Sequence, residues 1–306
     1  MSNPANTGET IDIDVNKWVE EARRNPVLFQ QRKCTDIVLT AIGLSSNLSE
    51  KLILKGGTLM ALAFGSERAT ADIDFTSIEE PEGFADNISE ELNARIPEAI
   101  NKLGYLDITC RVQSVEKRPR PRNFENMNFP ALLIRLGYAP KGGKQEEALS
   151  RKQAANIVEI EISFRDQVFH FQELYLEDAK VAVRAFSLSE IIAEKFRALF
   201  QQVTRNRYRR QDVYDIAYLI ENENIDDPLR SEILRVMKEK CFSRKIDIDA
   251  ESILIPEVKA RALADWDTLK LEVPDLPDFE EAFSKVSKFY RSLPWPHYPR
   301  PNIGFK

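Results

Sequence analysis

The stretch KLILKGGTLMALAFGSERATADIDFTSI, residues 51–78, combines an apolar run, a glycine pair, a helical segment and an Asp-x-Asp pattern. It predicts a strand over 51–54, a helix over 58–64 and a strand over 72–78. Because side chains alternate between the two faces of a strand, Asp72 and Asp74 point the same way. Two carboxylates about 7 Å apart along a strand can bind a hard cation such as Mg²⁺. The pair Gly56-Gly57 lets a backbone approach a phosphate, so the layout indicates a site for a nucleoside triphosphate and its metal.

An Asp-x-Asp pattern is weak on its own, because most such pairs are solvated ends of strands or loops. Two further Asp-Ile-Asp triplets occur, at 12–14 and 247–249. Only the triplet at 72–74 follows a glycine pair with a helical stretch between them. We therefore assign metal binding to Asp72 and Asp74 alone.

The composition is that of a soluble globular protein, with 43% hydrophobic and 30% charged residues and a net charge of −6. The length of 306 residues suits two domains. Three isolated cysteines, Cys34, Cys110 and Cys241, favour a reducing compartment without disulfides. With no signal pattern and no apolar stretch of about 18 residues, we expect a cytoplasmic protein without a membrane partner. Only two histidines occur, which leaves carboxylates, lysines and hydroxyls for catalysis.

The order of elements predicts an α+β fold with a mixed sheet, followed by an α-helical domain. We place the first domain at 1–184, with residues 1–14 as a loose leader in which 11–13 can add an edge strand. The second domain, 185–306, is expected to be helical and to end in a proline-rich, extended tail. Further expected elements are helices over 15–32 (restarting at Pro26), 36–44 and 87–104, strands over 105–115, 129–138 and 155–164, an exposed connection over 140–152, and helices over 187–204, 212–223, 226–241, 257–272 and 278–292.

The strand NIVEIEISF, residues 156–164, offers a third carboxylate for the metal site. Alternation places Glu159, Glu161 and Ser163 on one face and the apolar side chains on the other. The alternative is an ordinary amphipathic strand, and the residues alone do not decide between Glu159 and Glu161.

A second group of candidate residues lies in the helical domain. Lys195 follows Ile191 and precedes Leu199 by four residues, so it lies on or beside the apolar stripe of its helix. A lysine there needs an anionic partner, which a triphosphate would supply. Asp212 and Asp215 are one helical turn apart and can position this lysine, hold a metal or accept a proton. The alternative is an ion pair between adjacent helices.

Two basic segments are candidates for contact with RNA. RNRYRRQ, from residue 205, supplies four arginines and one aromatic ring for stacking. A second, exposed loop contains KRPRPRN, from residue 117. The alternative for the first segment is a solvated helix end. The residues concerned are Arg205, Arg207, Tyr208, Arg209, Arg210, Arg118 and Arg120.

Three motifs in the same order resemble the AbiEii/AbiGii-type toxins, nucleotidyltransferases of the DNA-polymerase-β-like superfamily that include a mycobacterial group modifying tRNA. The first motif is Leu-Lys-Gly-Gly-Thr at 54–58, followed by Arg-Ala-Thr-Ala-Asp-Ile-Asp-Phe at 68–75. The second is the strand carrying Glu161, which the resemblance favours over Glu159. The third joins 190–199, with Lys195, to 211–215, with Asp212. Thr70 stands where the family has serine, and Gln211 where it has arginine.

This resemblance implies a polymerase-β-like core that transfers a nucleotide from an NTP and releases pyrophosphate. It implies that Asp72, Asp74 and Glu161 bind Mg²⁺ or Mn²⁺ in two-metal catalysis and that Lys195 and Asp212 are catalytic. The nucleotide-binding residues that it implies are Lys55, Gly56, Gly57, Thr58, Arg68, Thr70 and Lys195.

The resemblance also implies a toxin of a toxin–antitoxin or abortive-infection system, with an antitoxin encoded nearby and RNA, in particular the 3′ end of a tRNA, as acceptor. Two alternatives stay open. The acceptor can be the hydroxyl of a protein or small molecule, or the chain can be a non-catalytic module that binds nucleotides or RNA.

Overall fold

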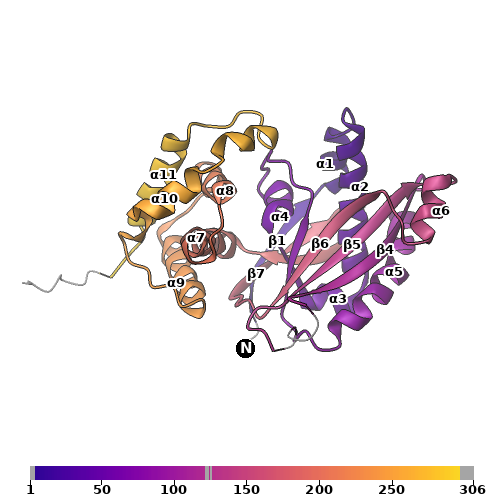
Figure 1. Cartoon of the computed structure of the whole chain (residues 1–306), viewed down its shortest axis with the longest axis horizontal. Coiled ribbons are helices and arrows are strands. Elements are labelled where there is room, and N and C mark those ends of the chain that lie inside the picture. The colour runs from indigo at the N-terminus through magenta and orange to yellow at the C-terminus, as the bar shows by residue number, and fades with distance from the viewer. Residues whose placement is uncertain (1–3, 121–123, 125, 297–306) are drawn as a thin grey trace, which may run out of the picture. The chain divides into compact units, whose positions relative to one another are not determined.

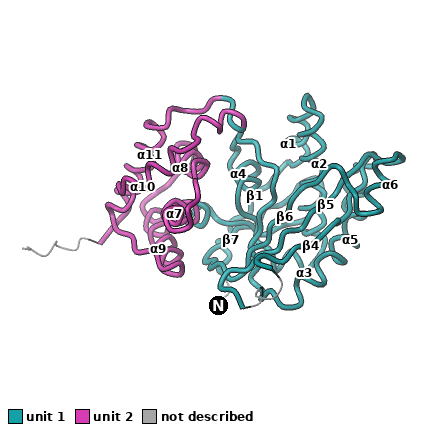
Figure 2. Tube along the Cα trace, viewed as in Figure 1, with its two compact units in different colours: residues 1–191, 272–274 teal, residues 192–271, 275–306 magenta. Residues whose placement is uncertain are grey.

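The computed structural model describes residues 4–120, 124 and 126–296. Its chain separates into two compact units, shown in different colours in Figure 2. Unit 1 comprises residues 1–191 and 272–274, and unit 2 comprises 192–271 and 275–306. The division falls a few residues after the boundary expected at 184/185, and residues 272–274 rejoin unit 1 from within the second half of the chain.

Unit 1 consists of one sheet with helices. Its strands are β1 (Ala5–Ile13), β2 (Leu52–Lys55), β3 (Ile73–Ser77), β4 (Ile108–Arg118), β5 (Ala131–Pro140), β6 (Asn156–Phe164), β7 (His170–Leu176) and β8 (Val181–Phe186). Its helices are α1 (Val15–Glu21), α2 (Pro26–Leu44), α3 (Ser46–Lys51), α4 (Gly56–Ala63), α5 (Phe84–Leu103) and α6 (Lys144–Ser150).

The strands form an eight-stranded mixed sheet in the order β1-β7-β8-β2-β3-β6-β5-β4. Figure 1 shows this sheet, with β1, β4, β5, β6 and β7 labelled. Strand β3 is central, antiparallel to β2 and parallel to β6. This pairing brings the Lys-Gly-Gly end of β2 and the glutamate strand β6 to opposite sides of the Asp-x-Asp strand. The α+β class expected from the sequence is confirmed, and so is the mixed sheet.

Helices α2 and α5 cover one face of this sheet. Phe84 of α5 packs edge-on against Phe164 of β6, with ring centroids 5.6 Å apart. The thiol of Cys34 in α2 lies 3.9 Å from that of Cys110 in β4. Phe164 and its alternating apolar neighbours therefore face the helices, and Glu159 and Glu161 project from the opposite face. We call that second face the open face of the sheet.

Several local expectations are corrected. The loose leader expected over 1–14 is wrong for residues 5–13, which form β1 parallel to β7, so the edge strand kept open at 11–13 is present. Residues 26–44 form one helix rather than two. It begins where expected, because Pro26 occupies its first turn and the Asn25 side chain accepts a hydrogen bond from the Leu28 amide. Residues 144–150 form helix α6 inside the exposed hairpin connection expected over 140–152, which is an addition to that expectation. Strands β7 and β8 were not expected.

Unit 2 is helical, as expected. Its helices are most of α7 (Leu188–Arg205), which the division crosses, then α8 (Arg210–Asn222), α9 (Asp227–Ser243), η1 (Ser252–Leu254), α10 (Pro256–Leu263), η2 (Trp266–Leu271) and α11 (Phe279–Arg291). The core contains Phe196 of α7, whose ring contacts those of Phe289 and Tyr290 in α11 at centroid distances of 6.3 and 5.3 Å. Of the tail expected to be extended, residues 297–306 lie outside the described residues.

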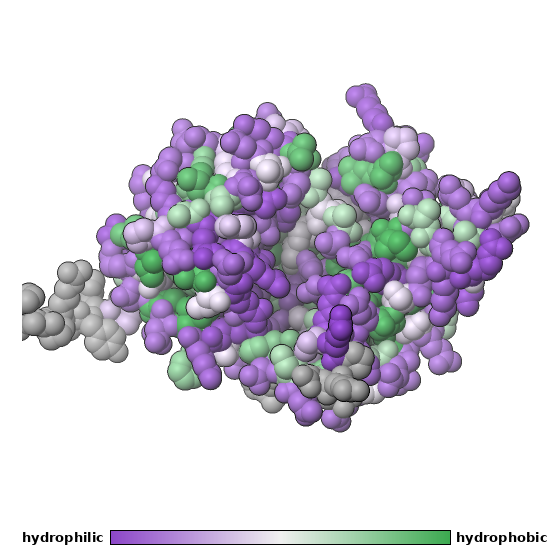
Figure 3. Space-filling view, viewed as in Figure 1, coloured by the Kyte–Doolittle hydropathy of each residue, from purple (hydrophilic) through white to green (hydrophobic). Residues whose placement is uncertain are grey.

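The face of the molecule drawn in Figure 3 is mainly hydrophilic, with apolar residues in small separate patches. Within the described part of the chain, none of the helices is long and apolar enough to cross a membrane.

Candidate active site

Three strands place charged residues side by side on the open face of the sheet. Lys55 of β2 lies opposite Asp74 of β3 in the antiparallel ladder. Asp74 in turn lies beside Glu161 of β6 in the parallel ladder. Asp72 precedes β3 by one residue and shares the side of Asp74. The structure therefore brings Asp72, Asp74 and Glu161 to one region of unit 1.

The neighbouring carboxylates repel each other. Partial desolvation raises the pKa of Asp72, and the negative charges of Glu159 and Glu161 raise it further. The Glu159 carboxylate is bound by Arg135, whose Nε lies 3.0 Å from its Oε1. Glu161 is exposed, and within the described residues its carboxylate has no hydrogen-bond or ion-pair partner. Of the two glutamates, Glu161 is thus the one available to a ligand.

Gly56 and Gly57 are required because other side chains of the protein pack directly against their backbone. Gly56 has φ +72°, and a Cβ on it would lie 2.0 Å from Oδ2 of Asp74. A Cβ on Gly57 would lie 2.6 Å from Oγ1 of Thr70 and 3.1 Å from Nη2 of Arg68. No other residue fits at either position, because the side chain would displace the aspartate or the Arg68–Thr70 pair.

Two predicted nucleotide-binding residues have partners within the protein. The Thr58 hydroxyl donates a hydrogen bond to the Asp72 carbonyl, at 2.8 Å, and the residue is buried. It therefore joins the first turn of α4 to the start of β3. The Arg68 guanidinium forms an ion pair with Glu272, with Nη1 and Oε2 3.1 Å apart.

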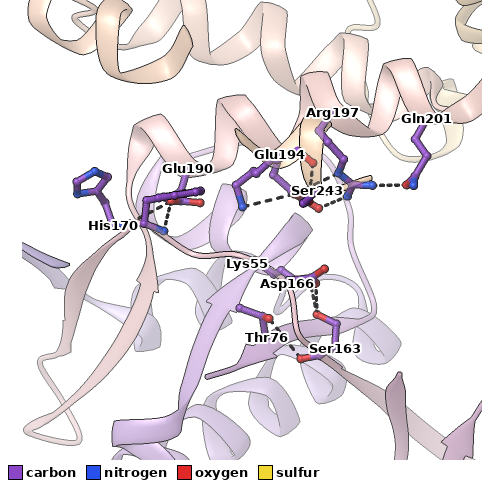
Figure 4. Close-up of polar contacts among 12 residues, drawn as sticks. Lys55, Thr76, Ser163, Asp166, His170, Glu190, Glu194, Arg197, Gln201 and Ser243 are labelled. Carbon is purple, nitrogen blue, oxygen red and sulfur yellow. Dashed lines mark hydrogen bonds and ion pairs between the residues drawn. The ribbon is translucent and has the colours of Figure 1, made fainter. Parts of the chain in front are cut away.

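Lys55, another predicted nucleotide-binding residue, is also bound by its own chain. Its Nζ donates to Oγ of Ser163, at 2.7 Å, and to Oδ2 of Asp166, at 3.1 Å. Ser163 donates to the same carboxylate oxygen at 2.6 Å. Figure 4 shows these three side chains close together, near Thr76 of β3. These contacts fix the Lys55 ammonium group on the strand next to Asp74.

The residues present fit a divalent cation shared with a substrate. Among the described residues, no group of three or more His, Cys, Asp and Glu side chains is close enough to hold a metal ion by itself. Mg²⁺, however, binds through one or two carboxylates together with phosphate oxygens and water. The Asp74 carboxylate occupies the volume that a side chain on Gly56 would fill, so it lies directly against the start of α4. The negative charges of Glu159 and Glu161, which raise the pKa of Asp72, favour a cation beside that carboxyl group. Asp72, Asp74 and Glu161 are oxygen donors of the required kind.

In unit 2, the structure brings Lys195 together with both aspartates of α8. Its Nζ lies 2.5 Å from Oδ2 of Asp215 and 3.4 Å from Oδ1 of Asp212. All three residues are buried. Oδ2 of Asp212 is buried without a hydrogen-bond donor, and Nη1 of the Arg209 guanidinium lies 3.9 Å from it. The ion pair between adjacent helices, which was the alternative interpretation of Lys195, is therefore present. Lys195 makes its shorter contact with Asp215.

The predicted RNA-binding residues lie at ends of elements. Arg207 and Tyr208, between α7 and α8, are exposed, and 53% of the tyrosine is accessible to solvent. In the second basic segment Arg118 and Arg120 are exposed, whereas its residues 121–123 lie outside the described residues. Arg205 is also exposed, and Arg209 and Arg210 are half-buried.

Four acidic or hydroxyl residues at these sites were not among the predicted site residues. Ser163 shares the face of Glu161, so strand alternation was a usable signal for it. Asp215 was recognised as a neighbour of Asp212 but was not selected. Asp166 follows β6, and Glu272 comes from 204 residues beyond Arg68, so neither carries a local signal.

A mixed sheet with a strand, a glycine pair, a helix and an Asp-x-Asp strand beside a further acid is the arrangement that the resemblance led us to expect in a nucleotidyltransferase. A family profile, described as nucleotidyl transferase AbiEii toxin of type IV toxin–antitoxin systems, matches residues 38–285. The chain belongs to this AbiEii family of nucleotidyltransferase toxins, which confirms the resemblance seen in the motifs. Membership in such a system implies that an antitoxin is paired with this toxin.

Two solved structures are similar to this chain at low sequence identity. MenT4, a nucleotidyltransferase toxin of Mycobacterium tuberculosis, superposes with a TM-score of 0.51 at 17% identity, over 90% of this chain and 87% of its own. JHP933 of Helicobacter pylori has a TM-score of 0.48 at 16% identity, over 89% of this chain and 91% of its own. No curated protein sequence matches this chain.

Proposed function

We propose that this toxin transfers a nucleotide from an NTP to an RNA acceptor, the 3′ end of a tRNA, and releases pyrophosphate. The observation that carries the proposal is the open face of unit 1. There Asp74 lies beside Glu161, and its carboxylate packs directly against the backbone of Gly56 at the start of α4. Asp72, whose pKa the charges of Glu159 and Glu161 raise, lies with Asp74 and Glu161 as oxygen donors that suit a triphosphate arriving with its metal.

Asp72, Asp74 and Glu161 would hold Mg²⁺ or Mn²⁺, which, when bound, neutralises the charge that develops on the phosphate oxygens. The chain's own residues do the rest. The Gly56 and Gly57 amides and Arg68 bind the phosphates, and Thr58 and Thr70 maintain the shape of the turn around them. Lys55, fixed by Ser163 and Asp166, contributes positive charge beside the acids. Glu161, exposed to solvent, can accept the proton of the incoming hydroxyl.

Lys195 and Asp212 are proposed as further catalytic residues. The support is the geometry within unit 2, where a buried lysine shares its charge with two acids. One carboxylate oxygen of Asp212 is buried without a donor, and such an oxygen is costly unless a ligand or proton satisfies it.

The proposed RNA contacts are the exposed arginines and Tyr208 between α7 and α8, with Arg118 and Arg120 as further candidates. Arginines bind phosphates, and an exposed ring can stack on an unpaired base. The net charge of −6 leaves a protein or small-molecule hydroxyl as the second candidate acceptor. The proposal places the toxin in the cytoplasm, in a system of the abortive-infection kind, with an antitoxin encoded nearby.

The test is to incubate the purified protein with Mg²⁺ or Mn²⁺, each labelled NTP in turn, and total tRNA. Label on tRNA that disappears in Asp72→Ala supports the proposal. Label on protein or small molecules alone favours the second acceptor class. Nucleotide binding without transfer to any acceptor, unchanged in Asp74→Asn, indicates a non-catalytic binding module and refutes the proposal.

A further inference from the structure

The ion pair between Arg68 and Glu272 joins distant parts of the sequence within unit 1. Nη1 of Arg68 lies 3.1 Å from Oε2 of Glu272, and the two side chains are 11% and 33% exposed. The guanidinium is therefore largely withdrawn from water. A cation in that position requires an anionic partner, and Glu272 supplies one.

A backbone contact fixes the glutamate independently of its side chain. The Ala69 amide donates a hydrogen bond to the Glu272 carbonyl, at 2.8 Å. The next residue, Val273, is 3% exposed. Residues 272–274 belong to unit 1, although the chain on both sides of them belongs to unit 2. Backbone, side chain and a buried neighbour thus hold this short segment against the Arg68 turn.

The guanidinium presents its two terminal nitrogens to different surroundings. Nη1 pairs with Glu272, whereas Nη2 lies 3.1 Å from the point that a Cβ on Gly57 would occupy. Nη2 therefore lies over the glycine pair, where the phosphates of the proposed substrate are placed. A guanidinium is planar and has five N–H donors, so one edge can bind a carboxylate while another binds a phosphate.

We propose that Glu272 is a positioning residue, which holds Arg68 through Nη1 so that Nη2 is directed at the triphosphate beside Gly57. This inference rests on the proposed function, since it takes the glycine pair as the phosphate site. A glutamate that merely occupied the phosphate position would compete with the substrate for the same atoms. In the proposed arrangement Glu272 binds Nη1 of Arg68 and the phosphate binds Nη2. The two anions can therefore bind the same guanidinium at the same time.

The test measures binding of each of the four ribonucleoside triphosphates, and of inorganic triphosphate, in the presence of Mg²⁺ by calorimetry. The proteins are the wild type, Arg68→Ala, Glu272→Ala, Glu272→Gln and the double variant Arg68→Ala/Glu272→Ala. Asp275→Asn is the matched control, because Asp275 is an exposed acid three residues later in the chain. Thermal melting of each variant shows that it is folded.

Loss of one charged hydrogen-bond partner predicts that Glu272→Ala weakens triphosphate binding about tenfold. Glu272→Gln, which retains an acceptor of the same size, should weaken it less and tests the inference if the alanine variant does not fold. Asp275→Asn should bind like the wild type. The double variant should bind no more weakly than Arg68→Ala, because Glu272 acts through that arginine.

Tighter binding in Glu272→Ala would show competition and overturn the inference, and so would unchanged binding. Losses that add in the double variant would also overturn it. If Arg68→Ala weakens binding and Glu272→Ala does not, the inference fails while the phosphate site stands. If the wild type binds no triphosphate, the proposed function fails, and the inference fails with it.

Discussion

Asp74 and Glu161 lie side by side on the parallel strands β3 and β6, on the face of the sheet that α2 and α5 leave uncovered. Neighbouring strands are about 4.8 Å apart, so these two acids are close neighbours. Lys55 lies opposite Asp74 from the other side. Lys55, Asp74 and Glu161 therefore form one row across three strands, with a lysine followed by two acids.

Gly56→Ala should abolish nucleotide transfer, whereas Gly104→Ala should leave it intact. Both glycines have φ +72°, so each substitution costs about 1 kcal/mol of backbone strain. A Cβ at Gly56 would also lie 2.0 Å from Asp74 Oδ2, while a Cβ at Gly104 meets nothing within 4 Å. Transfer rates and urea unfolding of both variants check this. Equal activity in the two would show that the close approach to Asp74 is not needed.

Asp166→Asn should raise the Mg²⁺ concentration needed for half-maximal activity several-fold, with a smaller effect on the maximal rate. Without the Asp166 charge, the Lys55 ammonium is free to neutralise the nearby Asp74 and compete with the metal. Asp107→Asn is the control, because it breaks the Lys33–Asp107 ion pair of 3.0 Å elsewhere in unit 1. A metal titration unchanged in Asp166→Asn, or changed equally by both variants, would contradict the prediction.

Substitutions of Asp212 and Asp215 should have different effects, one mainly on nucleotide transfer and the other mainly on the free energy of unfolding. Asp215 is fully buried and holds Lys195 at 2.5 Å, so Asp215→Ala should lower the free energy of unfolding by about 3–5 kcal/mol. Asp212 lies farther away, at 3.4 Å, and one of its oxygens has no donor. Asp212→Asn should therefore cost less stability yet reduce transfer at least about tenfold. Urea denaturation and transfer assays measure the two effects, and a fully active Asp212→Asn would remove this residue from the mechanism.

Asp36 predicts a pH dependence of stability that is unrelated to catalysis. Burial raises its pKa from 3.8 to about 7, and Asp178 adds to the shift, while Tyr105 and Thr40 oppose it by donating hydrogen bonds. Since the folded state keeps this proton when the unfolded state has lost it, stability should fall as pH rises from about 4 to 7. The full effect is about 4 kcal/mol.

Asp36→Asn should remove most of this slope, because the amide does not titrate. The amide also keeps an acceptor for the Tyr105 hydroxyl, which donates to Oδ2 of Asp36 at 2.8 Å. Denaturant unfolding of both proteins between pH 4 and 8 provides the measurement. The same slope in the variant would assign the dependence to other groups.

The central fold and its acids were predictable because their signals are local. The apolar run, the glycines and the alternation in 72–78 and 156–164 depend on residues that are neighbours in sequence. Strand β1 was not predictable in full, because residues 5–10 are exposed and polar and become a strand only by pairing with β7. The same holds for Asp166 and Glu272, whose partners Lys55 and Arg68 are distant in the chain.

The choice among neighbouring acids also required the structure. Sequence spacing treats Asp212 and Asp215 alike, since both lie on one helical face. Only packing shows that Asp215 takes the short contact with Lys195. Glu159 and Glu161 are likewise equivalent by alternation, and Arg135 on β5 distinguishes them by binding Glu159.

The most direct test of nucleotidyl transfer compares one NTP labelled at the α-phosphate with the same NTP labelled at the γ-phosphate, in the presence of total RNA and Mg²⁺. Transfer of a nucleotide places the α label on the acceptor, releases the γ label in pyrophosphate, and loses both signals in Asp74→Asn. Incorporation of the γ label, or α-label transfer that survives in Asp74→Asn, would contradict nucleotidyl transfer at this site.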